Sequence, residues 1–138
     1  MAINKPEKII VHCSDTPDNR DVTAADIHQW HTDGNGWSAI GYHWVIRRDG
    51  TLEAGRPDYM EGAHTKGENR RSIGVCMVGR DDFTEKQLTA LYGIVKRIQA
   101  RYHKPPETVM PVYGHCEFDR GKTCPNEQIM QFIRDSFR

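Results

Sequence analysis

Three side chains able to bind a metal or move a proton lie close together near the C-terminus. His115, Lys122 and Cys124 share one loop, which Pro125 closes. Histidine and cysteine are ligands that zinc prefers, and a lysine beside them is an unusual neighbour for a purely structural site. The loop supplies two zinc ligands, so a third has to come from elsewhere in the chain. The best candidate is His12.

The set His12, His115 and Cys124 matches a catalytic zinc site, which uses three protein ligands and keeps a fourth position for water. Zinc lowers the pKa of that water to about 7 and polarises a carbonyl group. A nearby cation and a phenol stabilise an oxyanion or manage its proton, and Lys122 and Tyr42 are the candidates. Taken singly, these residues also have structural interpretations: a satisfied core histidine, a solvated lysine and a core aromatic ring.

Length and charge limit the classes of protein to consider. The 138 residues suffice for one domain, residues 1–138, and the formal net charge of zero argues against general nucleic-acid binding. No stretch reaches the roughly 18 apolar residues of a membrane span. Met1 to Glu7 lack the apolar run of a signal peptide. We therefore expect no nucleic-acid partner, no membrane insertion and a cytoplasmic location. With no export signal, the four cysteines are expected to be thiols and not disulfides.

The elements that must position these residues follow from hydrophobic periodicity and turn signals. The predicted strands are Lys8–Ser14, Tyr42–Arg48, Thr51–Gly55, Ser72–Val78 and Thr108–Tyr113. The apolar character of Ser72–Val78 predicts that it is the central strand. The predicted helices are Thr23–His31, a long one from Thr84 to the terminator Pro105-Pro106, and one that starts at Pro125. Because Asp49-Gly50 signals a hairpin, one pair of strands is antiparallel. The sequence thus predicts a single α/β domain whose mixed sheet of about five strands is flanked by about three helices.

Local details refine these elements. Thr23 with Asp26, and Thr84 with Gln87, form predicted capping boxes. Pro125 suits the first position of the last helix. Strand alternation predicts that Tyr42, Trp44 and Ile46 share one face of the sheet. His28 and His31 stand at helical spacing, which allows a second metal site, although two surface histidines without a nearby carboxylate or cysteine are the simpler interpretation.

Five segments, spread in order over nearly the whole chain, strongly resemble zinc-dependent N-acetylmuramoyl-L-alanine amidases of the phage lysozyme type. They are Val11–Ser14, Gln29–His31, Gly41–Arg56, Ser72–Cys76 and Lys122–Pro125. The same fold family includes the peptidoglycan recognition proteins. The resemblance implies hydrolysis of the amide between N-acetylmuramic acid and the L-alanine of the stem peptide in peptidoglycan.

The resemblance also implies roles for individual residues. His12, His115 and Cys124 match the family's Zn²⁺ ligands, and Tyr42 and Lys122 match its catalytic pair. The substrate groove is expected to be lined by His64, Trp30 and His31. The loop before Cys124 is one residue longer than in similar proteins, with Gly121 as the insertion, which affects the placement of Lys122. Glu117 is an alternative acid or base, or an ordinary surface residue.

A phage or prophage endolysin is the expected biological role. Such a monomeric enzyme waits in the host cytoplasm and reaches the cell wall, for cytolysis, after membrane disruption. The alternative is a non-catalytic peptidoglycan-recognition module, but the presence of Cys124 favours the enzyme. Some phage amidases of this type also bind RNA polymerase, so RNA polymerase is a second partner that the resemblance admits, although the arm before His12 is short.

Overall fold

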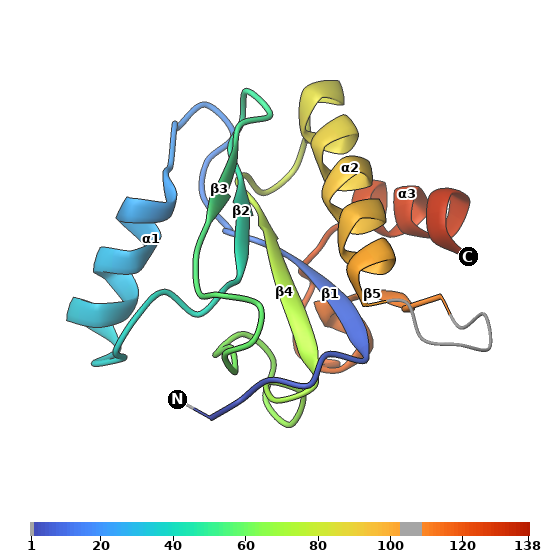
Figure 1. Cartoon of the computed structure of the whole chain (residues 1–138). Helices are drawn as coiled ribbons and strands as arrows, with labels where there is room; N and C mark the ends of the chain where they lie inside the picture. The colour runs from blue at the N-terminus through green and yellow to red at the C-terminus, as the bar shows by residue number, and fades with distance from the viewer. Residues whose placement is uncertain (1, 103–108) are drawn as a thin grey trace.

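The computed structural model describes residues 2–102 and 109–138 and contains one five-stranded sheet (Figure 1). The strands are β1 (Lys8–Cys13), β2 (Trp44–Ile46), β3 (Leu52–Ala54), β4 (Ser72–Met77) and β5 (Val112–Gly114). The helices are α1 (Ala24–Gln29), α2 (Glu85–Arg101) and α3 (Glu127–Phe137), with a π-helical turn η1 (Trp30–Gly34) and a 3-10 turn η2 (His115–Glu117). The predicted α/β fold with a mixed sheet is confirmed.

The strand order is β3-β2-β4-β1-β5. Strands β2, β4, β1 and β5 run parallel, and β3 pairs with β2 in the antiparallel direction. The predicted Asp49-Gly50 turn joins these two strands, and Gly50 has the positive φ of 88° that favours glycine. Strand β4 lies at the centre of this order, as predicted, and every one of its residues is buried.

Helices cover both faces of the sheet: α2 and α3 lie on one side and α1 on the other (Figure 1). The larger core lies under α2 and α3, and a smaller core, which includes Val45 and Cys76, lies under α1. Along β1, Ile9, Val11 and Cys13 point into the larger core. The alternation of a strand then places the side chain of His12 on the opposite face, that of the smaller core.

The predicted caps of the first two helices are confirmed. The Thr23 side chain accepts a hydrogen bond from the backbone N–H of Asp26, and the Thr84 side chain accepts one from Gln87. The apolar stripe of α2 packs into the larger core, as the periodicity predicts. The predicted terminator Pro105-Pro106 lies outside the described residues, and α2 ends at Arg101.

Two predictions of local structure are wrong. Pro125 is not the first residue of α3, because Asn126 is the N-cap, its side chain accepting a hydrogen bond from the N–H of Ile129. Tyr42 does not share a face with Trp44: Tyr42 packs on the smaller core and Trp44 on the larger one. The regular strand begins only at Trp44, so strand alternation does not extend back to Tyr42.

None of the helices within residues 2–102 and 109–138 has the length and apolar character needed to cross a membrane.

Candidate active site

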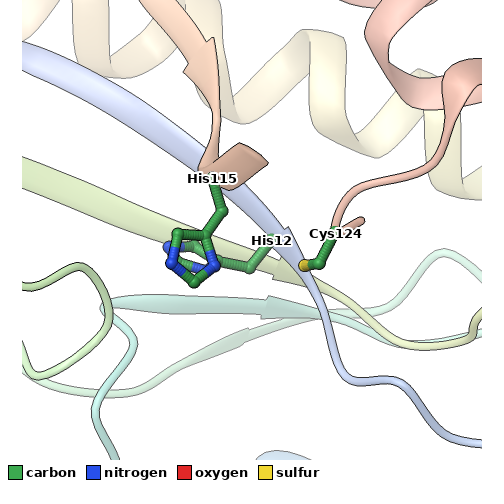
Figure 2. A group of neighbouring side chains, drawn as sticks. All are labelled: His12, His115 and Cys124. Atoms are coloured by element: carbon green, nitrogen blue, oxygen red, sulfur yellow. The ribbon is translucent and has the colours of Figure 1, made fainter. Parts of the chain in front are cut away.

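The two histidines of the predicted metal site meet at the carboxyl edge of the sheet. Strand β5 runs parallel to β1, with Gly114 opposite Val11. The next residue of each strand is therefore His115 beside His12, and their ring centroids lie 4.4 Å apart. Figure 2 shows both rings together, His12 at the end of β1 and His115 at the start of the turn that follows β5.

Cys124 joins the histidines from the loop that precedes α3 (Figure 2). Its Sγ accepts a hydrogen bond from the backbone N–H of Cys13 at 2.8 Å, and its carbonyl accepts one from Cys116 at 2.8 Å. These bonds fix the loop against the ends of β1 and β5.

The donor set fits a zinc ion. One ligand atom from each of His12, His115 and Cys124 lies within 4.8 Å of the other two. Bonds of about 2.0–2.3 Å in a tetrahedron place zinc ligands about 3.3–3.8 Å apart, so small side-chain movements complete the geometry. Among the residues that the structure describes, this is the one cluster of side chains that could hold a metal ion.

Burial sets the protonation states of the three residues. It lowers the pKa of His12 well below 6.5, and neighbouring His64 and His115 lower it further. Burial also lowers the pKa of His115. Both rings are therefore neutral at pH 7, as metal ligands must be. The hydrogen bond with Cys13, together with burial, raises the pKa of the Cys124 thiol, so metal binding releases a proton there.

A cavity of about 660 Å³ opens over this cluster and is lined by both predicted catalytic residues, Tyr42 and Lys122. The Tyr42 ring lies 5.2 Å from that of His12. Burial raises the pKa of the Tyr42 phenol well above 10.0, so its O–H remains a hydrogen-bond donor at neutral pH. Lys122 is exposed and lies at the same cavity. The site therefore combines a neutral phenol, a lysine and a set of side chains that could hold a metal ion.

The residues predicted to line a substrate groove have different environments. His31 lines the cavity, and its Nδ1 accepts a hydrogen bond from the N–H of Gly41. His64 also lines the cavity but is only 9% exposed. Trp30 is not among the cavity residues, and its indole lies 5.2 Å from the guanidinium of Arg20. Contact between these side chains and a substrate stays a prediction.

Two alternative site residues have structural partners. His28 Nδ1 accepts a hydrogen bond from the N–H of Ile40, so His28 orders a loop and is not part of the metal-compatible cluster. The Glu117 carboxylate binds the N–H of Gly114 and the guanidinium of Arg138, and it does not line the cavity.

The sequence interpretation did not single out three residues of the site. Trp37 lines the cavity and lies edge-on to His31 at 4.6 Å between ring centroids. Trp37 directly follows a turn that contains Gly34 and Gly36, and this position in the sequence could have indicated an exposed aromatic side chain. Thr65 and Ser72 form buried hydrogen bonds with His64. No pattern in the sequence indicates that these two hydroxyl groups belong to the site.

A mixed α/β sheet with two histidines and a cysteine clustered at the carboxyl ends of its parallel strands defines a candidate metallohydrolase. Residues 3–127 match the family described as N-acetylmuramoyl-L-alanine amidase. The chain belongs to this family, which confirms the predicted enzyme class. Enzymes of the family are generally zinc-dependent.

Phage endolysins are among the relatives. The chain is similar to the endolysin of Enterobacteria phage K11, with 38% identity over 135 residues that cover 92% of this chain and 85% of the relative. It is similar to the endolysin of Escherichia phage T7, with 42% identity over 104 residues that cover 70% of this chain and 68% of the relative.

Solved structures show the same fold. The N-acetylmuramoyl-L-alanine amidase LysC from Clostridium intestinale superposes with a TM-score of 0.83 at 26% identity, over 98% of this chain and 89% of that one. Bumblebee PGRP-SA superposes with a TM-score of 0.85 at 25% identity, over 98% and 85% of the two chains.

Proposed function

We propose that this chain is a zinc-dependent endolysin, which hydrolyses the amide between N-acetylmuramic acid and L-alanine in peptidoglycan. Membership of the amidase family supports the reaction, and the similarity to phage endolysins supports the role in host-cell lysis. The observation that carries the proposal is the convergence of His12, His115 and Cys124 within 4.8 Å, beneath a cavity lined also by Tyr42 and Lys122.

His12, His115 and Cys124 would hold the metal. A zinc ion bound there supplies a water of lowered pKa and a Lewis acid for the scissile carbonyl. The Tyr42 O–H donates a hydrogen bond to the oxyanion that develops from this carbonyl, a contribution of about 10²–10³ in rate for one such donor. The Lys122 ammonium stabilises the same negative charge and gives a proton to the leaving amine.

The proposed setting is the infected bacterial cell. The enzyme accumulates in the host cytoplasm and meets peptidoglycan after the membrane is disrupted, as the likeness to the endolysins of phages K11 and T7 supports. A monomeric state and a contact with RNA polymerase stay predictions from the resemblance.

A peptidoglycan-recognition module is the second candidate, supported by the fold shared with bumblebee PGRP-SA. Such a module needs the cavity but neither a metal nor the catalytic pair. The metal-compatible set of His12, His115 and Cys124 favours the enzyme.

Metal content and activity measured together test the proposal. Activity is followed as the fall in turbidity of a purified peptidoglycan suspension, with bound zinc measured by elemental analysis. We expect a chelator to abolish activity and zinc to restore it. Cys124→Ser should lose both zinc and activity, whereas the control Cys116→Ser, in the same loop but outside the metal-compatible set, should keep both. Stoichiometric, tightly bound zinc in Cys124→Ser would remove Cys124 from the ligands.

A further inference from the structure

His64 lies against the ring of His12 at the wall of the cavity. Its Nδ1 lies 2.9 Å from Nε2 of His12, and both rings are buried. The Thr65 hydroxyl lies 3.0 Å from the same His64 nitrogen and 3.2 Å from His12 Nε2. The other ring nitrogen of His64 lies 3.3 Å from the hydroxyl of Ser72. Both nitrogens of His64 are therefore engaged with protein groups, which leaves none for a substrate.

The backbone is shaped to admit this ring. A Cβ atom at Gly74 would lie 2.6 Å from Cδ2 of His64, and one at Gly62 would lie 2.4 Å from the same atom. Asn69 fixes the segment from the other end, because its Oδ1 accepts hydrogen bonds from the N–H groups of His64 and Thr65, both at 2.9 Å. The missing side chains of Gly62 and Gly74 thus leave the space that the His64 ring occupies, and the hydrogen bonds to Asn69 fix the backbone that carries it.

The hydrogen-bond chain has a defined direction, because it ends on a group that only accepts. The Ser72 hydroxyl donates to the carbonyl oxygen of Glu68 at 2.7 Å. Its oxygen is then free to accept from Nε2–H of His64. A neutral imidazole carries one proton, so Nδ1 of His64 is an acceptor. His12 Nε2 faces that acceptor at 2.9 Å and must carry a proton, since two lone pairs would repel each other.

We propose that His64 is a positioning residue, which fixes the ring orientation and tautomer of His12 so that Nδ1 presents its lone pair to the metal. Thr65 and Ser72 complete the chain from His12 to the Glu68 carbonyl. This inference rests on the proposed zinc site. It assigns to His64 a role through His12 in place of the predicted direct contact with substrate. Metal-binding histidines in general depend on such a partner at their second nitrogen, and its loss typically weakens metal affinity by about 10–100-fold.

Zinc affinity, measured by competition with a chromophoric chelator, tests the role without any activity assay. His64→Phe fills much of the same space but cannot accept a hydrogen bond, so we expect zinc affinity to fall by about 10–100-fold. His64→Asn places an amide oxygen near the position of Nδ1 and should restore most of that affinity. The control His28→Phe removes a histidine outside the metal-compatible set and should bind zinc like the wild type.

A spectroscopic measurement on the unmodified protein keeps the inference testable even where a variant folds poorly. Long-range ¹H–¹⁵N correlation spectra report which imidazole nitrogen carries the proton. We expect protonated Nε2 in His12, and in His64 protonated Nε2 with bare Nδ1. A proton on Nδ1 of His12, or wild-type zinc affinity in a folded His64→Phe variant, would overturn the inference while leaving the amidase intact. Failure of the wild-type protein itself to bind zinc would overturn the metal site, and the role of His64 with it.

Discussion

Gly74 allows a quantitative test of how closely the fold is built around His64. Gly74→Ala adds a Cβ atom 2.6 Å from Cδ2 and 2.7 Å from Cγ of the His64 ring. Contacts below about 3 Å force one of the two groups to move, and β4, with every residue buried, gives the backbone little freedom. The ring must therefore shift, which breaks its hydrogen bond to His12.

The expected cost has two parts. Overpacking of a buried site costs about 1–3 kcal/mol, and the lost hydrogen bond adds about 1 kcal/mol. Gly74→Ala should thus lower the free energy of unfolding by about 2–4 kcal/mol. For a domain of this size, about 3–5 °C per kcal/mol gives a fall in Tm of roughly 10 °C. Zinc affinity should fall together with stability.

The assay is denaturant unfolding of Gly74→Ala in the wild-type and His64→Ala backgrounds. Without the ring the added methyl group has space, so Gly74→Ala should cost at least about 1 kcal/mol less in the second background. The control is Gly93→Ala in α2, where a Cβ atom meets nothing within 4 Å. It should stabilise the protein by about 0.5–1 kcal/mol through helix propensity. An equal cost of Gly74→Ala in both backgrounds would refute the reasoning, because the ring would then not be what the methyl group meets.

Tyr42→Phe should keep zinc and the fold but lower turnover by about 10²–10³, measured as peptidoglycan hydrolysis at saturating zinc; unchanged turnover would reduce Tyr42 to packing. Lys122→Met should likewise lower turnover with normal zinc content, and loss of zinc would instead place Lys122 in the metal site. Gln87→Ala should cost about 2–3 kcal/mol in denaturant unfolding, because the buried Gln87 side chain donates to the Val78 carbonyl and accepts from Arg48; a change below 0.5 kcal/mol, a limit typical of exposed positions, would contradict this. Burial lowers the pKa of His43 and His64 below 6.5. As the pH falls, these histidines are therefore protonated in the unfolded chain before they are protonated in the folded protein. The free energy of unfolding should thus decrease as the pH drops below about 6.5. Denaturant unfolding at about pH 7 and pH 5 checks this, and equal stability at both values would contradict the burial argument.

The sequence predicts the elements well where local chemistry decides them. The capping boxes at Thr23 and Thr84 mark the starts of α1 and α2 because the cap is made by residues three positions apart. The mostly apolar sequence of β4 predicts a buried strand, because both faces of an interior parallel strand are covered. The hairpin at Asp49-Gly50 likewise depends on a local backbone conformation.

Errors arise where tertiary packing decides. Pro125 fits the first turn of a helix by its φ angle, but Asn126 caps α3 with its side chain instead. Strand alternation predicts that Tyr42 shares the face of Trp44, yet Tyr42 precedes the regular part of β2, and its ring lies 5.2 Å from that of His12. The helix expected over Thr23–His31 is a regular α-helix only from Ala24 to Gln29, because a π-helical turn begins at Trp30.

In the candidate site, too, some features follow from the local sequence and others depend on tertiary packing. Residue types and the family resemblance single out His12, His115 and Cys124, and the register of β1 with β5 brings the two histidines together. The partner role of His64 depends on the approach of Gly62 and Gly74, which no spacing in the sequence reveals.

Analysis of the ends that the protein creates in purified peptidoglycan tests the central claim most directly. The protein is incubated with peptidoglycan in the presence of a zinc chelator, and again after zinc is restored. The account predicts new N-terminal L-alanine, which disappears with the chelator and returns with zinc. New reducing sugar ends would contradict it by showing cleavage of the glycan strand. Peptidoglycan that is retained by the zinc-loaded protein without any new ends would also contradict it, and would identify a recognition module.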